Sequence, residues 1–299
     1  MRRVPPEKNY TREQLVSKVR FVRRLANLGT GVFFGKKRMG QELYLETTAG
    51  RVRVLAYGLE RPEKLPLFVN MHGGGFVLGN AEMDDPHLMN VAHKANVKIL
   101  NVDYSLAPEA PFPKALEECY AVVKYAKEHA GELGIDPERI AVGGHSAGGN
   151  LSAAICLLDA ERKELGIKCL ILDYPPLDLH TDPYLKPRPK GTYLHPRLCR
   201  VFDASYCMEK EERKNPLVSP LYASLEQLKT FPPTLIITAS QDSLCQEGEA
   251  FRDRLLQAGV DVTHKRFEGS KHGFTMTNRP DSMEGWQMII DHLKRYLHD

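Results

Sequence analysis

Ser146 lies in a glycine-flanked motif that could supply a nucleophile. Residues 144–148 read Gly-His-Ser-Ala-Gly, directly after the apolar run Ile140–Gly143 and directly before a helical pattern. This strand–turn–helix context is typical of the G-x-S-x-G motif, whose sharp turn leaves no room for side chains two positions either side of the serine. The following helix N-terminus favours developing negative charge. An ordinary glycine-rich turn is the structural alternative.

A second glycine run follows the predicted strand Leu67–Met71, upstream of the serine. It reads His-Gly-Gly-Gly at residues 72–75. Glycine amides can approach a substrate carbonyl closely because no Cβ is in the way. We expect the amides of Gly74, Gly75 and Ala147 to hold the oxyanion of a tetrahedral intermediate. Neither turn is followed by the Lys-Ser/Thr pair of a phosphate-binding loop, so a phosphate site is not indicated.

A serine hydroxyl needs a base to take its proton and a third group to orient that base. Among the 11 histidines, His272 lies in a loop between the last predicted strand and the last predicted helix. In chains with this serine motif, the acid lies between the serine and the histidine. Asp242, directly after the predicted strand Thr234–Ala239, is the preferred acid, and Asp178 competes with it. A turn aspartate without a catalytic role is the remaining alternative.

The chain resembles the hormone-sensitive-lipase-like family of α/β-hydrolase carboxylesterases, over about residues 40–299. The matching segments, in family order, are His72–Phe76, Asp103–Glu109, Gly144–Gly149, Asn215–Pro220, Asp242 with Leu244, and His272–Phe274. The resemblance implies an α/β-hydrolase fold, with a mostly parallel eight-stranded sheet, helices on both faces, a helical cap, and hydrolysis of small carboxylic esters. His145 departs from the acidic residue or threonine usual in the family, which is expected to alter nearby hydrogen bonding.

Several other residues near these motifs have two readings. Phe76, Leu244 and Phe274 adjoin catalytic positions in the sequence, and they could line an acyl pocket or belong to the core. The carboxylates of Asp103 and Glu109 could be mistaken for an acid–base pair. Their place after a strand and before a proline favours bracing of the oxyanion loop.

The elements that must position these residues are short apolar or β-branched runs that alternate with helix-length segments from residue 41 onward. This succession predicts an α/β protein with a largely parallel sheet covered on both faces. The predicted strands are Glu42–Thr47, Val52–Tyr57, Leu67–Met71, Lys98–Val102, Ile140–Gly143, Lys168–Asp173, Thr234–Ala239 and Val260–Phe267. The predicted helices cover about 85–95, 112–130, 147–164, 247–258 and 281–297.

Two segments do not fit this alternation. Residues 1–40 contain one amphipathic helix, with Thr11 and Gln14 at capping-box spacing. We interpret it as a cap helix with a solvated basic face rather than a membrane-surface helix. Residues 179–216 form a connection whose length is typical of a lid or binding element. We therefore expect a single domain over residues 1–299, with a core at 41–178 and 217–299 and a cap at 1–40 and 179–216. The apolar stripe of the first helix consists of Leu15, Val19, Val22 and Leu25.

Composition excludes several function classes. The 299 residues carry a formal net charge of +3, which demands no nucleic-acid partner. No apolar run reaches membrane-span length, and no apolar segment follows the first arginines as in a secretory signal. The six cysteines are scattered without metal-ligand or C-x-x-C spacing. We expect reduced thiols, a cytoplasmic protein, and no metal or cofactor, with a small-molecule ester as partner; a homo-oligomer remains open.

The leading hypothesis is a serine carboxylesterase that acts on short-chain esters through a Ser-His-Asp triad and an acyl-enzyme. An O-acetyl carbohydrate deacetylase is the alternative among hydrolases. A non-catalytic small-molecule receptor on the same fold is the alternative from another class. Presence of His272, which such receptors have lost, favours the enzyme.

Overall fold

The computed structural model describes residues 4–29, 38–189, 191–192 and 194–298. An eight-stranded sheet runs through the molecule in the order β1-β2-β4-β3-β5-β6-β7-β8. β2 is antiparallel to both of its neighbours, and the remaining pairs are parallel. The strands are Gln41–Thr47 (β1), Gly50–Tyr57 (β2), Leu65–Met71 (β3), Lys98–Val102 (β4), Ile135–His145 (β5), Cys169–Asp173 (β6), Thr234–Ala239 (β7) and Val262–Phe267 (β8).

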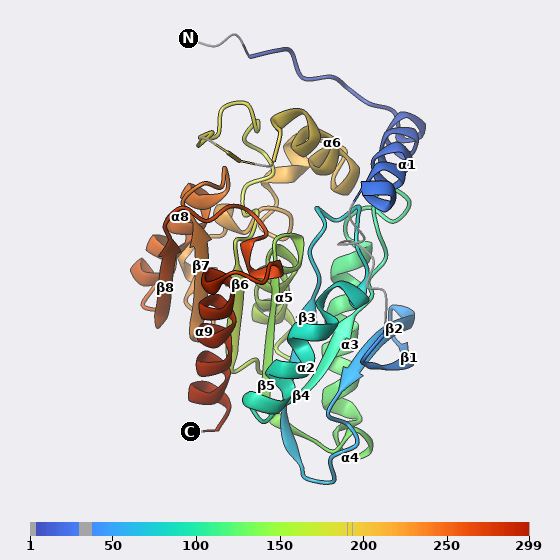
Figure 1. Ribbon diagram of the computed structural model, residues 1–299, viewed down its shortest axis with the longest axis vertical. Coiled ribbons are helices and arrows are strands. Elements are labelled where there is room, and N and C mark those ends of the chain that lie inside the picture. Colours follow the sequence, from blue (N-terminus) through green and yellow to red (C-terminus); the bar gives the residue numbers. More distant parts are fainter. Residues whose placement is uncertain (1–3, 30–37, 190, 193, 299) are drawn as a thin grey trace.

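Helices cover both faces of the sheet (Figure 1). α2 and α9 pack on one face, whereas α3, α5 and α8 pack on the other. The α-helices are Arg12–Gly29 (α1), Asp85–Lys94 (α2), Lys114–Glu128 (α3), Ala130–Leu133 (α4), Ala147–Arg162 (α5), Pro196–Tyr206 (α6), Leu225–Leu228 (α7), Cys245–Gln257 (α8) and Pro280–Leu297 (α9). Short 3-10 turns are Ala81–Asp84 (η1), Glu211–Lys214 (η2), Pro220–Tyr222 (η3) and Phe274–Met276 (η4).

The central strands are buried on both faces, so their sequences are continuous apolar runs rather than alternating ones. Successive side chains of β3 go to opposite cores: Leu67 and Val69 pack with the α3 and α5 layer, and Phe68 packs with the α2 and α9 layer. The α/β-hydrolase architecture predicted from the sequence is confirmed. The eight predicted strands are present, and β5 begins earlier than expected because Ile135 pairs with Leu65 across an irregularity in register.

The 179–216 segment lies above the carboxyl ends of the parallel strands, with α6 as its main element (Figure 1). This helix was not predicted. Its start carries ordinary signals, since Pro196 occupies the first turn and the His195 ring accepts a hydrogen bond from the Arg197 amide at 3.2 Å. The proline-rich sequence around it obscured those signals.

The N-terminal segment reaches this same region. Thr11 and Gln14 form the expected reciprocal cap of α1, with donor–acceptor distances of 3.2 and 3.4 Å. Leu15 and Val19 are buried against α6 and the loop after β3. Leu25, expected in the same apolar stripe, is instead 53% exposed. Residues 1–3 and 30–37 of the expected cap lie outside the described residues.

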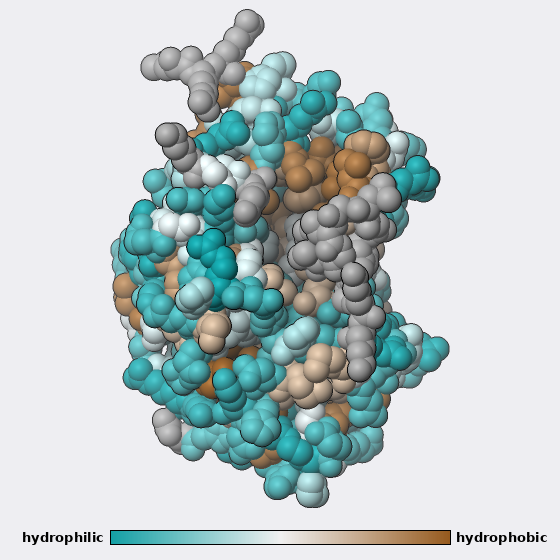
Figure 2. All heavy atoms as spheres, in the orientation of Figure 1, coloured by the Kyte–Doolittle hydropathy of each residue, from teal (hydrophilic) through white to brown (hydrophobic). Residues whose placement is uncertain are grey.

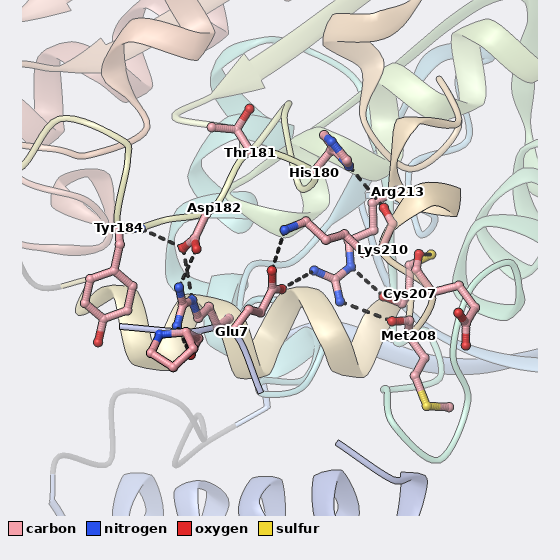
Figure 3. A network of polar contacts seen from close by, with 12 residues as sticks. Glu7, His180, Thr181, Asp182, Tyr184, Cys207, Met208, Lys210 and Arg213 are labelled. Atoms are coloured by element: carbon pink, nitrogen blue, oxygen red, sulfur yellow. Dashed lines mark hydrogen bonds and ion pairs between the residues drawn. The ribbon is translucent and has the colours of Figure 1, made fainter. Parts of the chain in front are cut away.

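Ion pairs attach the first residues to the cap (Figure 3). Glu7 contacts both Lys210 and Arg213. The Arg200 guanidinium pairs with Asp182 and donates to the carbonyl of Pro5 at 2.9 Å.

Apolar residues gather over α1 on the face that Figure 2 shows. Within the described ranges, no helix is both long and apolar enough to cross a bilayer.

Candidate active site

Ser146 occupies a strained turn between β5 and α5. Its backbone has φ 53° and ψ −123°, a conformation that costs a non-glycine residue about 1–3 kcal/mol. A Cβ on Gly144 would lie 2.3 Å from the carbonyl oxygen of Met71, and one on Gly148 would lie 1.9 Å from it. The Ser146 amide donates to the Asp173 carbonyl at 2.8 Å. Neighbouring strands therefore hold the turn, and the flanking glycines permit it.

The structure brings Ser146, His272 and Asp242 together. Ser146 Oγ lies 2.9 Å from His272 Nε2, and His272 Nδ1 lies 2.7 Å from Asp242 Oδ2. The Asp242 side chain is 1% exposed and also accepts the Leu244 amide at 3.1 Å. The loops after β7 and β8 supply the acid and the base, so adjacent parallel strands place them at the same edge. This is the geometry of a serine activated through an oriented imidazole.

Asp178, the competing acid, has a different task. Its Oδ1 accepts hydrogen bonds from the amides of His180 and Thr181, at 3.1 and 2.9 Å. The carboxylate therefore shapes the chain as it leaves the core for the cap, and the base of the site is bound to Asp242 instead.

The glycine run after β3 presents bare amides beside the serine. Gly74 has φ 124°, and a Cβ there would lie 2.0 Å from the Leu78 carbonyl oxygen. In the described part of the chain, the amides of Gly74, Gly75 and Ala147 donate to no protein acceptor. All three residues lie at or next to the cavity over Ser146. Unpaired amides that converge beside a nucleophile can stabilise an oxyanion.

The 103–109 segment holds this glycine loop. Tyr104 Oη donates to the His72 carbonyl at 2.8 Å, and the Ala107 amide donates to the Phe76 carbonyl at 2.9 Å. Asp103 accepts the Ala81 amide, while its second oxygen pairs with Arg53. Glu109 pairs with Arg23 of α1. The Tyr104 hydroxyl and the Ala107 amide thus hold the glycine loop directly, whereas the carboxylates of Asp103 and Glu109 bind neighbouring residues.

His145 lies behind the glycine loop, 4% exposed. Its Nε2 is 3.1 Å from the Gly73 amide nitrogen and 3.2 Å from Asp84 Oδ1. A neutral Nε2 accepts from Gly73, whereas a protonated Nε2 donates to Asp84, so the two bonds exclude each other. Burial by itself lowers the pKa of His145, but the Asp84 carboxylate, with a smaller contribution from Asp173, outweighs burial and raises that pKa above its usual value. We favour the ion pair because Asp84 Oδ1 has no other hydrogen-bond partner among the described residues.

A cavity of about 600 Å³ lies over Ser146, between the strand ends and the cap. Phe76 and Leu244 are among the residues that line it, and Phe76 also packs in the core. Phe274 is placed differently: its ring is 4% exposed, packs against the rings of Tyr174 and Phe267, and is not among the lining residues. Phe274 therefore belongs to the core beneath the site.

Comparison with known proteins identifies the family of this chain. A family model for the alpha/beta hydrolase fold matches residues 68–276. The arylesterase of Saccharolobus solfataricus is 36% identical over 210 residues, which are 70% of this chain and 68% of that protein. Carboxylesterase NlhH of Mycobacterium tuberculosis is 32% identical over 241 residues, 79% of this chain and 75% of that protein. The chain belongs to the hormone-sensitive-lipase-like esterases.

A solved structure extends the family likeness to the cap. The thermostable carboxylesterase EstE1, cloned from a metagenomic library, is similar with a TM-score of 0.82 and 30% identity, covering 95% of this chain and 97% of that one. The α/β-hydrolase fold and the hormone-sensitive-lipase-like family expected from the sequence are thus confirmed. Within the described ranges, no group of three or more histidine, cysteine or acidic side chains could hold a metal ion.

Sequence reasoning missed the residues beneath His272. The Tyr174 ring meets the His272 ring edge-on with centroids 4.9 Å apart, and its hydroxyl lies 2.6 Å from Thr275 Oγ1. Thr275 donates to Asp173 Oδ2 at 2.7 Å. Burial raises the pKa of Asp173 to about 7. Position at the carboxyl end of β6 is the signal that could have identified Asp173 and Tyr174, because strand ends meet at the site.

Proposed function

We propose that the protein is a serine carboxylesterase that hydrolyses short-chain carboxylic esters. The observation that carries the proposal is the contact chain from Ser146 Oγ to His272 at 2.9 Å and on to Asp242 at 2.7 Å, beside bare amides in a cavity. Each part answers one need of acyl transfer: a nucleophile, a base for its proton, an orienting carboxylate and donors for the oxyanion.

In the first half-reaction, Ser146 Oγ attacks the ester carbonyl while His272 Nε2 accepts the hydroxyl proton. The carbonyl oxygen becomes an oxyanion, which the amides of Gly74, Gly75 and Ala147 stabilise. When the tetrahedral intermediate collapses, His272 gives the proton to the leaving alcohol and the acyl group stays on Ser146. Asp242 holds the imidazole tautomer and stabilises its charged form.

In the second half-reaction, water attacks the acyl-enzyme. His272 accepts a proton from that water, the same oxyanion site is used again, and the acid is released as the proton returns to Ser146. The steps need only groups that the chain itself supplies. We therefore expect activity to survive treatment with EDTA.

Size and lining of the cavity support small esters. About 600 Å³ is a volume typical of small-molecule sites. Phe76, Leu244 and α6 enclose the space around Ser146, which leaves less room for a long acyl chain than an open groove would. We expect preference for acyl chains of about two to six carbons, declining over several carbons because each methylene contributes only about 1–3 kcal/mol.

A p-nitrophenyl ester series from acetate to palmitate tests the proposal. Highest kcat/KM is expected on short chains, and highest kcat/KM on palmitate would contradict the small-ester part. Nearly exclusive use of acetate would favour the deacetylase alternative. A serine-reactive organophosphate should inactivate the enzyme, with the adduct on Ser146 by mass spectrometry. An adduct on a different serine would overturn the choice of nucleophile.

A further inference from the structure

One charged side chain interrupts the apolar face that α6 turns toward the cavity. Residues at helical spacing along that face line the cavity; they are Leu198, Cys199, Phe202 and Asp203. Phe202 lies against the glycine loop, since a Cβ on Gly75 would come within 2.5 Å of its ring. A carboxylate among these groups costs free energy unless something solvates or pairs with it. Its presence there therefore suggests a binding role.

Asp203 has no partner among the residues that the structure describes: its carboxylate accepts no hydrogen bond and forms no ion pair there. The charged neighbour on the cavity wall is Lys186, whose side chain is 9% exposed. Lys186 Nζ lies 2.6 Å from Glu247 Oε2 and donates to the Asp178 carbonyl at 2.6 Å. An ammonium group has three donors, so Lys186 keeps one for another acceptor.

Electrostatics join Asp203 and Lys186 although they do not touch. Burial raises the pKa of Asp203 to about 7, while Lys186 and Arg213 pull it down and Glu247 and Asp178 push it up. Burial by itself lowers the pKa of Lys186, but the carboxylates of Glu247, Asp203 and Asp178 together outweigh burial and raise that pKa, so Lys186 stays charged. An acceptor and a spare donor thus lie on the same cavity, beside the apolar side chains of α6.

We propose that Asp203 and Lys186 form a polar subsite for a substrate hydroxyl, so that the preferred esters carry a hydroxyl group on their carbon chain. The inference rests on the proposed ester hydrolysis and names its substrate class. The hydroxyl donates to the Asp203 carboxylate and accepts from the free N–H of Lys186. A plain alkyl chain leaves Asp203 unpaired, and a substrate ammonium is repelled by Lys186. Monoesters of polyols and sugars belong to this class.

The test compares matched esters that differ by one hydroxyl. Acetates of linear alcohols are paired with the monoacetates of the corresponding terminal diols, and methyl esters of alkanoic acids with their terminally hydroxylated forms. The readout is the ratio of kcat/KM, hydroxylated over plain, which we call the hydroxyl ratio. In the native protein it should exceed one for at least one chain length in one of the two series. A ratio below one throughout both series would overturn the subsite.

Variants of Asp203 test whether this residue causes the preference for a hydroxyl group. Asp203→Leu replaces a charged hydrogen-bond acceptor with an apolar side chain of similar size. It should therefore lower the hydroxyl ratio about tenfold or more. Asp203→Asn keeps an amide acceptor and should lower it less. Asp253→Leu, a matched change at an acidic residue 64% exposed on α8, should leave the ratio as in the native protein. An unchanged ratio in Asp203→Leu contradicts the proposal. If that variant does not fold, an unchanged ratio in Asp203→Asn contradicts it equally.

Amino esters distinguish a subsite for a hydroxyl group from a subsite for an ammonium group. If 6-aminohexyl acetate is preferred over 6-hydroxyhexyl acetate, and both Asp203 variants abolish that preference, the subsite binds an ammonium and the hydroxyl assignment is overturned. Absence of turnover on every ester, with native protein folded by circular dichroism, refutes the proposed hydrolysis itself. That outcome is distinct from active enzyme without a hydroxyl preference.

Discussion

The two walls of the cavity are built in different ways. The sheet-side wall consists of the Ser146 turn, the 72–75 glycine loop and the loops that carry Asp242 and His272. Backbone contacts hold it, and at Gly148 a Cβ would lie 1.9 Å from a neighbouring carbonyl oxygen. The cap-side wall consists of residues 179–216 with the N-terminal arm. Side-chain ion pairs such as those of Glu7 hold much of it (Figure 3).

This difference separates chemistry from specificity. Backbone that is packed to contact admits few substitutions, so the reacting groups stay in register. Partly exposed ion pairs contribute only about 0–1 kcal/mol each, so cap residues can change without loss of the fold. Asp203 on α6 can therefore set substrate preference independently of the groups that break the bond. The predictions below test this division in order of decreasing effect.

Loss of the nucleophile should have the largest effect. Ser146→Ala is expected to lower kcat about 10⁴–10⁶-fold, as removal of a triad member does elsewhere. Alanine tolerates φ 53° no worse than serine, so the midpoint of thermal unfolding should stay close to that of the native protein. Turnover of p-nitrophenyl butyrate measures the first effect and calorimetry the second. A variant that retains more than a tenth of native activity would remove Ser146 from its role.

Substitution of each candidate acid by asparagine should distinguish the residue that acts in catalysis from the one that shapes the chain before the cap. Asp242→Asn is expected to lower kcat about 10⁴-fold, because the amide favours the wrong tautomer of His272. Asp178→Asn keeps an oxygen that can accept the His180 and Thr181 amides, so kcat should change little. The reverse pattern in steady-state kinetics would exchange the assignments of the two residues.

A methyl group in the glycine loop should disable the oxyanion site. Gly74→Ala places a Cβ 2.0 Å from the Leu78 carbonyl oxygen and is expected to lower kcat about 10²–10³-fold or more. Gly259→Ala is the matched control, since φ is 85° there and no atom lies within 4 Å of the added Cβ. The control should lose about 1–2 kcal/mol of stability and keep its kcat. An equal loss of kcat in both variants would attribute the effect to positive φ rather than to the glycine loop, and native kcat in both would contradict the oxyanion role of the loop.

The buried pair behind the loop should give stability a pH dependence. Because Asp84 raises the folded pKa of His145, the stabilising contribution is complete below the unfolded pKa of about 6.5 and is lost as pH rises through the folded pKa. The native protein should therefore exceed His145→Gln in unfolding free energy by more at about pH 6 than at about pH 9. Urea denaturation across this range measures the difference.

His292 is the control of opposite sign. Burial lowers its pKa to about 4, so its contribution is present above the unfolded pKa and is lost as pH falls. The advantage of the native protein over His292→Gln should shrink toward acid. If the difference in unfolding free energy from the native protein changed with pH in the same direction for His145→Gln and His292→Gln, the ion pair of His145 with Asp84 would be refuted.

Loosening the cap should have the smallest effect. Glu7→Gln weakens the contacts to Lys210 and Arg213. It is expected to lower the unfolding free energy by less than about 1 kcal/mol, because Glu7 is partly exposed. Proteolysis of the N-terminal arm should become faster while kcat changes little. Glu226→Gln, which affects an exposed pair with Lys229 away from the cap, should not alter the proteolysis rate. A large loss of kcat in Glu7→Gln would show that the arm positions the reacting groups.

Local motifs predicted much of the fold and most of the candidate site. Ser146 and the glycine loop could be located because each demands an unusual backbone that few sequences allow. Chain order directed attention to Asp242 and His272, and the structure places His272 against Ser146 and Asp242 against His272. Adjacency in sequence was a weaker guide, since Phe274 follows His272 closely and yet packs into the core.

By itself, the sequence determined the strands, the serine turn and the glycine loop, because apolar runs and glycine spacing act over a few residues. Tertiary structure alone decided that Asp84 meets His145, that Glu7 reaches Lys210, and that Asp203 and Lys186 share a cavity wall. These partners come from different elements, and no local period relates them. Their contacts follow from how the cap lies over the strand ends, which depends on the packing of the whole chain.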